Sequence, residues 1–303
     1  MKRKTLAGSM AIFLNICFIS SAAVAIFMAT RRISIISGSG SMYMMVVSSV
    51  PGLAAIGICS INRIPLESLG LKLNLRKNIR FYLLGWLMPV VLAAAGAILY
   101  FLAYPGNFDS GMKLMTETLV SQGVSRRNVT LLFTLQLMGG LFIAPIANLI
   151  PCGMEELGFR GFLLPAISRR IPSAQWSVII SSLLWGLWYV PLAAIGYRYG
   201  AVSLENSWKA MGFVVLFSLM TGCILSWLRL KTNSILPGVL FRSVLNGFAT
   251  AAAWFIAGPY DMFIGPAVWG ILGGIPLLVC GALCISMCKG KTTFESAAGE
   301  QRE

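Results

Sequence analysis

The chain has 303 residues, of which 57% are hydrophobic and only 11% are charged. Because a soluble domain averages about a quarter charged residues, this composition excludes a soluble globular protein and indicates several membrane spans. The formal net charge is +14, and the basic residues flank apolar segments instead of forming one patch, so we expect membrane lipids as partners and no nucleic acid.

Apolar segments of about 20 residues, the length that crosses the hydrocarbon layer, recur along the chain. They predict an all-α fold, a polytopic membrane helical bundle of about eight transmembrane helices: Leu6–Thr30, Met42–Ser60, Phe81–Ala103, Leu131–Ile150, Trp176–Ile195, Met211–Leu228, Ile235–Ala257 and Met262–Met287. We expect N-terminal helices and loops in 1–130, a functional core in 131–257, and the last transmembrane helix with a polar cytoplasmic tail in 258–303. The longest connector, Tyr104–Thr130, is polar enough for a short amphipathic helix on the outer face.

Lysine and arginine set the expected orientation, because short cytoplasmic loops carry more of both. In an eight-span arrangement the side of the N-terminus holds the larger share, including the basic connector Asn62–Arg80. We therefore predict a multi-pass protein of the plasma membrane with both termini in the cytoplasm. The first segment is either a cleaved signal peptide, because Ala23-Val24-Ala25 resembles a cleavage site, or an uncleaved anchor, which its length favours.

The chain has seven cysteines and no C-x-x-C pair, so we expect neither a disulfide framework nor a zinc ribbon. Cys280, Cys284 and Cys288 share one helix face. This spacing is typical of packing by small apolar side chains, and palmitoylation of the juxtamembrane Cys288 is the alternative.

Two adjacent carboxylates, Glu155 and Glu156, follow an apolar segment and precede Arg160. Carboxylates near hydrocarbon are costly and are rarely present without a partner or a function. On a helix Glu156 and Arg160 share a face and can pair. Glu155 lies about 100° away and is free to face the bundle interior, where it would suit a general base. The alternative is an interfacial helix whose carboxylates contact headgroup water at the cytoplasmic boundary.

Arg242 lies inside the seventh predicted segment, where arginine is expensive, and Asn246 lies one turn further on the same face. A buried guanidinium needs an anion, and Glu155 or Glu156 is the obvious one. The alternative is that Arg242 extends to the cytoplasmic surface, as long basic side chains near helix ends do.

Three motifs follow one another in the core: Glu155-Glu156-x-x-x-Arg160, Trp185-x-x-x-Tyr189 and Arg242-x-x-x-Asn246. In order and spacing they resemble the motifs of the CPBP family, the CAAX-prenyl endopeptidases and bacteriocin-processing intramembrane proteases, also called the Abi family. Members carry Glu-Glu-x-x-x-Arg, Phe-x-x-x-His and His-x-x-x-Asn or Asp on consecutive helices. The resemblance covers about Met138–Ala249. It implies an endopeptidase site open to the cytosol and the bilayer, where the first glutamate and a histidine activate water, directly or through a bound metal such as zinc.

Both family histidines are replaced here, by Tyr189 and Arg242. Tyrosine, with a pKa near 10, is a poor base at neutral pH, and arginine neither binds a metal cation nor accepts a proton. We therefore expect no metal cofactor and an ion pair between Arg242 and Glu155. The remaining catalytic alternative uses Glu155 as base, with Arg242 and Asn246 as oxyanion donors.

Three functional hypotheses follow from this pattern. The first is a CAAX-type intramembrane endopeptidase for prenylated or leader-peptide substrates, impaired or inactive because the histidines are absent. The second is a catalytically dead scaffold or immunity protein that binds a membrane partner. The third is a transporter, which only the several spans and the intramembrane charge pair support. We expect the site residues to converge in one cytoplasm-facing cavity: Glu155, Glu156, Arg160, Tyr189, Arg242 and Asn246.

Overall fold

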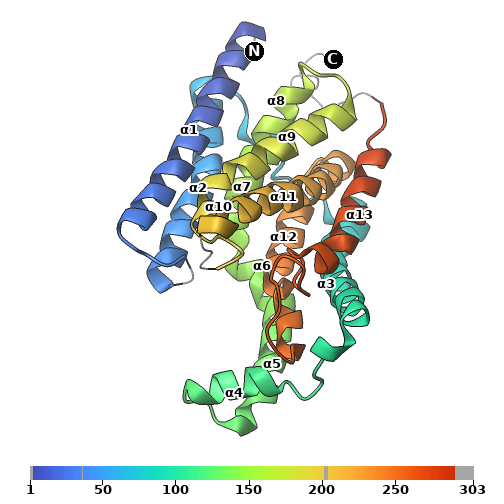
Figure 1. Cartoon of the computed structure of the whole chain (residues 1–303). Coiled ribbons are helices and arrows are strands. Elements are labelled where there is room, and N and C mark those ends of the chain that lie inside the picture. Colours follow the sequence, from blue (N-terminus) through green and yellow to red (C-terminus); the bar gives the residue numbers. More distant parts are fainter. Residues whose placement is uncertain (1–2, 36, 201–203, 291–303) are drawn as a thin grey trace.

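The computed structural model describes residues 3–35, 37–200 and 204–290. Within these ranges the elements are helices, and the one β contact is an isolated bridge between Phe108 and Ile256. The predicted all-α helical bundle is therefore confirmed. In Figure 1, α1 (Arg3–Thr30) packs beside α2 (Gly38–Ile61) on one side of the bundle, while α3 (Leu75–Ala103) and α13 (Ile271–Met287) lie together on the other.

Six helices of the described residues are long and apolar enough to cross a membrane. They correspond to the first six predicted segments, with ends that differ by a few residues, and they indicate a multi-pass membrane protein. Their bounds are Leu6–Thr30, Gly38–Ile61, Leu75–Ala103, Arg126–Ala147, Ala174–Ala194 and Asn206–Thr232.

The seventh and eighth predicted spans are shorter than expected. The helix α12 (Leu236–Phe248) has 13 residues, or about 20 Å, against a hydrocarbon layer of about 30 Å, and a 3₁₀ turn, η6 (Ala251–Phe255), follows it. The helix α13 begins at Ile271 instead of Met262. The hydropathy of the sequence stays high through the segment between α12 and α13, so it does not reveal where the helices end. The Gly and Pro residues of 258–270 interrupt the helical structure in this segment. Six helices of the described residues therefore have the full length of a span, and α12 and α13 are shorter helices in the same bundle.

The segment from 129 to 168 is one helical run that is interrupted several times. Each of the two π-helical turns is followed by a short α-helix, α6 or α8. Both of these helices have a proline at their second residue, Pro145 in α6 and Pro165 in α8. Proline has no N–H to donate to the residue four positions earlier, so the hydrogen-bond ladder shifts there. The elements are α5 (Val129–Met138), η4 (Gly139–Ile143), α6 (Ala144–Ala147), α7 (Leu149–Glu156), η5 (Leu157–Leu163) and α8 (Leu164–Ser168).

The remaining core helices are α9 (Ala174–Trp188), α10 (Val190–Ala194) and α11 (Leu204–Thr232). The short α12 packs between α3 and the interrupted run. Small residues permit this close approach: a Cβ on Gly247 of α12 would lie 2.6 Å from the Cα of Gly140 in η4. The close contact holds the later part of α12 against the run that carries the two glutamates.

Polar connectors occupy both ends of the bundle. A 3₁₀ turn, η1 (Leu66–Leu69), lies between α2 and α3, and an arm at the other end consists of η2 (Pro105–Asn107), α4 (Lys113–Ser121) and η3 (Arg126–Asn128). The expected short helix in this arm is present as α4. Asp109 accepts hydrogen bonds from the backbone N–H groups of Lys113 and Gly111 at 2.7 and 2.9 Å, and these bonds lower the pKa of its carboxyl.

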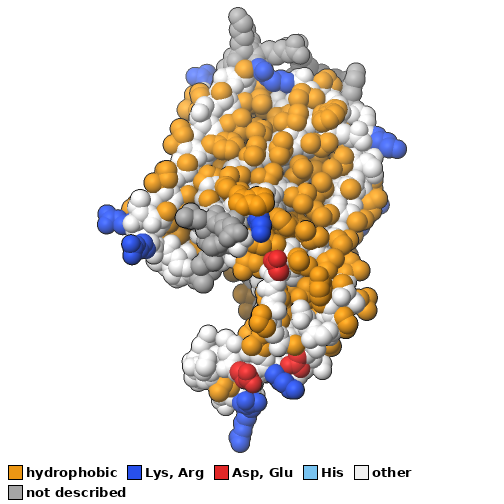
Figure 2. Space-filling view, in the orientation of Figure 1, with side chains coloured by type: hydrophobic (Ala, Val, Ile, Leu, Met, Phe, Trp, Pro, Cys, Tyr) orange, Lys and Arg blue, Asp and Glu red, His pale blue; other side chains and the backbone are white. Residues whose placement is uncertain are grey.

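The start of α1 and the end of α13 lie at the same end of the bundle (Figure 1). This arrangement agrees with the expected placement of both termini on one side, although it does not identify the side. Figure 2 shows hydrophobic side chains over much of the visible face, with most of its charged side chains toward the ends and edges and two near the middle.

The described cysteines form no disulfide. Cys288 is 5% exposed and packs in a small cluster with Leu164, Ala174, Val178 and Cys223. Burial raises the pKa of its thiol to about 11, which leaves little of the nucleophilic thiolate at neutral pH. Packing is therefore the interpretation that the structure favours over palmitoylation.

Candidate functional site: a buried cluster of two glutamates and two arginines

Glu155 is buried in the centre of the bundle, with one carboxylate oxygen contacting three donors. The Oε2 atom accepts hydrogen bonds from Trp185 Nε1 at 3.0 Å, Tyr189 Oη at 2.6 Å and Arg242 Nη2 at 2.9 Å. The donors come from α9, from the junction of α9 and α10, and from α12. Arg242 Nη2 also lies 3.1 Å from Tyr189 Oη. Three distant segments therefore meet at one carboxylate.

Glu156 holds the second half of the cluster. Its Oε1 atom lies 3.1 Å from Arg160 Nη1 and 3.4 Å from Arg242 Nη1. The predicted pair of Glu156 and Arg160 is present, and so is the expected ion pair of Arg242 with Glu155. Arg242 is 4% exposed and bridges both glutamates, so it does not extend to the surface. Two carboxylates and two guanidiniums balance each other's charge.

Trp185 lies between the two arginines. The guanidinium carbon of Arg160 is 4.2 Å from the centre of its ring, and that of Arg242 is 4.9 Å away. Each contact is within the range of a cation–π interaction. Sequence reasoning named Trp185 only as the first residue of a motif, because the family has an apolar ring there, and it did not expect the indole N–H to contact Glu155.

Local backbone features place Arg160. It lies in the π-helical turn η5, and such turns inside α-helices often reposition side chains. Its guanidinium occupies space next to Gly222 of α11, where an added Cβ would lie 2.6 Å from Arg160 Nη2 and 2.6 Å from Ser182 Cβ. The Nε and Nη2 atoms of Arg160 are buried without a hydrogen-bond partner in the described part of the chain. The cation is therefore held by one carboxylate, the indole and tight packing.

Asn246 does not join the cluster directly. Its side chain is exposed, and its Nδ2 atom lies 3.6 Å from the Sγ atom of Cys152. Cys152 is buried and its backbone oxygen lies 3.4 Å from Arg242 Nη1. Asn246 follows Arg242 by one turn, as predicted, but it reaches the cavity beside the cluster and not the carboxylates.

That cavity has a volume of about 430 Å³. Its lining includes three of the predicted site residues, and the full lining is Ile35, Ser41, Met44, Met45, Ser48, Ala147, Asn148, Pro151, Cys152, Glu155, Tyr197, Arg198, Arg242 and Asn246. The other three, Glu156, Arg160 and Tyr189, lie behind this wall.

The cavity extends from the charged cluster toward the end of the bundle that holds the α1–α2 connector. Ile35 belongs to that connector, and Ser41 lies in the first turns of α2. The N-terminus lies at the opposite end (Figure 1). A cytoplasmic N-terminus and a cytoplasm-facing cavity therefore cannot both be right, and the two sequence-based expectations conflict here.

Arg198 and Tyr197 also line the cavity, and sequence reasoning missed both as site residues. They lie in the connector after α10, and the rings of Tyr197 and Tyr189 stack with centroids 4.8 Å apart. The signal in the sequence was a basic residue between two aromatic ones, Tyr197-Arg198-Tyr199, which is a weak pattern by itself.

The donors of this site do not suit zinc. Zinc prefers Cys, His, Asp and Glu ligands, and no group of three or more of them able to hold a metal occurs within the described residues. The donors around Glu155 are an indole N–H, a phenol and a guanidinium. A fixed cation beside both carboxylates would repel a metal ion, so we derive no step through a metal.

Comparison with known proteins supports the resemblance read from the motifs. Residues 130–248 match the family model described as type II CAAX prenyl endopeptidase Rce1-like. A protein of Methanococcus maripaludis named CAAX prenyl protease 2 is 29% identical over 100 residues, which are 32% of this chain and 36% of that protein. The match thus spans about a third of the relative's length. The family-model match includes Glu155, Tyr189 and Arg242, so the middle part of this chain is similar to the Rce1-like CAAX prenyl endopeptidases.

Proposed function

We propose that this chain is an Rce1-like membrane protein with little or no endopeptidase activity, which acts by binding a peptide, a lipidated protein or another membrane partner. One observation carries the proposal: Arg242 pairs with Glu155 and also contacts Glu156. The cluster is thereby neutral without a metal, a substrate or a water molecule.

The hydrogen bonds of Glu155 support the same proposal. A general base must direct a lone pair of one oxygen at the water that it activates. Three donors already approach the Oε2 atom of Glu155 at 3.0 Å or less, and a carboxylate oxygen has only two lone pairs in its plane. A water at Oε2 would have to displace a tryptophan, a tyrosine or an arginine that the bundle holds in place, so only the other oxygen of Glu155, Oε1, is left for one.

A second candidate function is proteolysis without histidine. It is favoured by the position of Glu155, Arg242 and Asn246 on the wall of one cavity. In that mechanism Glu155 takes a proton from water, while Arg242 and Asn246 donate to the tetrahedral oxyanion. No comparable observation on the described residues favours the transporter hypothesis.

A cleavage assay in liposomes separates the two candidates. The wild type, Glu155→Ala and the double variant Tyr189→His/Arg242→His are reconstituted with a prenylated peptide and with a leader peptide, and the archaeal relative serves as positive control. We expect the wild type and Glu155→Ala to show the same background rate. Cleavage by the wild type that Glu155→Ala abolishes would refute the proposal and establish the glutamate mechanism.

We also propose that the protein resides in the plasma membrane with both termini in the cytoplasm. The basic residues near the N-terminal end of the bundle support this orientation, and the cavity then faces the outer side. Reporter fusions after residues 118 and 300 test it. Opposite sides are expected, because residue 118 lies in α4 at the far end, and reporters on the same side would contradict the orientation.

A further inference from the structure

Arg198 is a cation on the wall of the cavity and has no carboxylate partner among the described residues. The ion pairs of the described residues use Lys72, Arg160 and Arg242, and none includes Arg198. Its Nε atom is buried and has no hydrogen-bond partner among these residues. Arg198 lies between the candidate spans Ala174–Ala194 and Asn206–Thr232, and a partly buried guanidinium without a counter-charge is costly, so this position favours an anion from outside the described chain.

Aromatic rings hold the guanidinium of Arg198 in place. Its central carbon lies 3.5 Å from the ring centre of Trp269, 5.1 Å from that of Tyr197 and 5.7 Å from that of Tyr189. Stacking of this kind fixes the planar group while leaving the N–H edge available. A ligand would therefore meet a preorganised donor, which reduces the entropy lost on binding.

Further polar groups lie on the same wall. Asn148, Asn246, Ser41 and Ser48 line the cavity together with Arg198. Of these, Asn246 and Ser41 have exposed side chains. A phosphate group accepts hydrogen bonds from arginine, amide and hydroxyl donors at once, so the donor set suits a phosphate.

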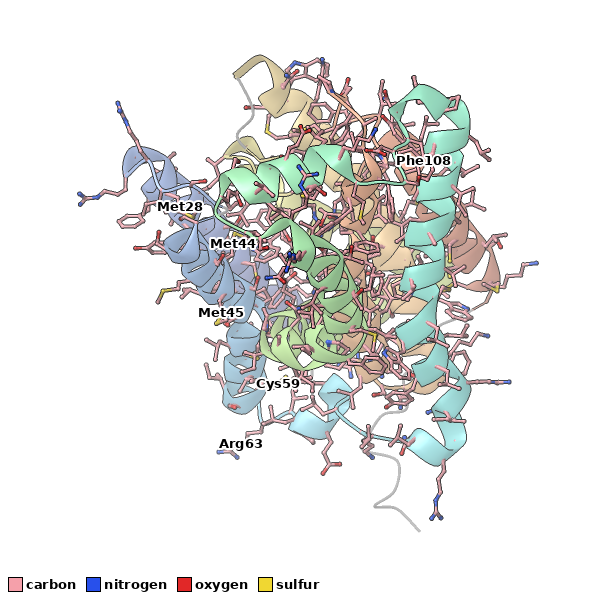
Figure 3. All side chains as sticks on the ribbon, turned by 90° about the horizontal axis from the view of Figure 1, so that it is seen from below. Met28, Met44, Met45, Cys59, Arg63 and Phe108 are labelled. Atoms are coloured by element: carbon pink, nitrogen blue, oxygen red, sulfur yellow. The ribbon has the colours of Figure 1, made fainter. Side chains whose placement is uncertain are left out.

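The cavity also opens beside lipid-facing surfaces. The later part of α2 packs against α7, where a Cβ on Gly52 would lie 2.8 Å from the backbone oxygen of Met154. The earlier part of α2 lines the cavity with Met44 and Met45, which Figure 3 shows beside the run that begins with α5. Large exposed apolar side chains flank both walls: Met42, Met45 and Val46 on α2, and Ile146, Leu149 and Ile150 on α6 and α7.

From these observations we infer that the cavity binds an anionic phospholipid, with the phosphate on Arg198 and the acyl chains between α2 and the α6–α7 segment. A cavity with one unpaired cation and flanks of exposed apolar side chains on candidate spans suits an amphiphile better than a soluble anion, because a bilayer supplies such a ligand laterally. The inference concerns binding and does not depend on whether the protein cleaves peptides.

Native mass spectrometry of the full chain in mild detergent tests the inference. After delipidation the protein is titrated with phosphatidylglycerol and, separately, with phosphatidylcholine. We expect one phosphatidylglycerol to bind at least about tenfold more tightly than phosphatidylcholine, since both lipids carry a phosphate but the quaternary ammonium of phosphatidylcholine cancels its charge and would lie near the Arg198 guanidinium. Arg198→Gln should remove this preference, and Arg198→Lys should keep part of it.

Two further variants control for folding and for surface charge. Arg126→Gln removes an exposed arginine of the arm, remote from the cavity lining, and should leave the preference intact. Ser41→Trp fills the cavity from an exposed position on α2 without altering Arg198, and should weaken phosphatidylglycerol binding even if Arg198→Gln fails to fold.

Several results would overturn the inference. One is equal affinity of the wild type for the two lipids, and another is an unchanged preference in the folded Arg198→Gln and Ser41→Trp variants. Binding of glycerol 3-phosphate as tightly as the lipid would assign the site to a soluble anion. Saturation by an apolar peptide with a free carboxylate, but not by phosphatidylglycerol, would assign it to a peptide. The cleavage assay is independent of all these outcomes.

Discussion

Arg242 and Arg198 line the same cavity but lie in opposite electrostatic surroundings. Arg242 pairs with Glu155 at 2.9 Å and contacts Glu156 at 3.4 Å. Arg198 stacks on Trp269, Tyr197 and Tyr189 and forms no ion pair within the described ranges. The difference teaches that one residue type occupies two kinds of surroundings here, since the first cation is neutralised by two glutamates and the second has no counter-charge among the described residues.

The largest loss of stability should follow from removing Arg242, the cation that contacts both glutamates. Arg242→Ala leaves two buried carboxylates with only Arg160, and breaking a buried ion pair costs about 3–5 kcal/mol in soluble proteins. The loss will be smaller if water enters through the cavity. Tyr189→Phe removes only one hydrogen-bond donor to Glu155, a loss of about 1.5–3 kcal/mol.

Thermal unfolding of the purified variants in one detergent measures both losses. The lower apparent melting temperature should belong to Arg242→Ala. If Tyr189→Phe unfolds first, or if Arg242→Ala is as stable as the wild type, the cluster is not held together by this arginine.

A loss of stability of intermediate size is expected from a substitution at Gly222, where α11 packs against Arg160 of the cluster. Gly222→Ala would place a Cβ 2.6 Å from Arg160 Nη2 and 2.6 Å from Ser182 Cβ, and overpacking of this kind costs about 1–3 kcal/mol. The matched control is Gly212→Ala on the same helix, where an added Cβ has nothing within 4 Å. Unfolding in detergent should show a loss for Gly222→Ala and none for Gly212→Ala. Equal stability of the two variants would mean that Arg160 moves aside easily.

The smallest effect on stability should come from Arg198. Arg198→Gln breaks no ion pair of the described residues and loses mainly the stacking on Trp269, worth about 0.5–2 kcal/mol. We therefore expect this variant to be more stable than Arg242→Ala in the same unfolding experiment. A loss as large as that of Arg242→Ala would mean that Arg198 is a structural residue, and the contrast between the two arginines would fail.

Much of this organisation could be predicted from residue patterns, because hydropathy and local spacing determine it. The six long spans follow from apolar length, and the pair of Glu156 and Arg160 from its position on one helix. The contact of Arg242 with a glutamate follows from the cost of a lone cation in hydrocarbon.

Other features required the three-dimensional packing. Hydropathy averages over the breaks after α12 and before α13, so two short helices looked like full spans. The side chain of Trp185 looked apolar until its N–H was placed beside Glu155. Arg198 lies in a connector, and only the stack on Trp269, distant in sequence, shows that it faces the cavity.

The central claim is that the Arg242 guanidinium occupies the place of a family histidine and so prevents metal binding. The metal content of the purified protein tests this claim most directly. Protein isolated from cells grown with zinc is assayed by mass spectrometry beside Glu155→Ala. We predict well below one zinc per chain in both, since a guanidinium adjoins both carboxylates. One zinc per wild-type chain, lost in Glu155→Ala and accompanied by cleavage that a chelator blocks, would contradict the claim.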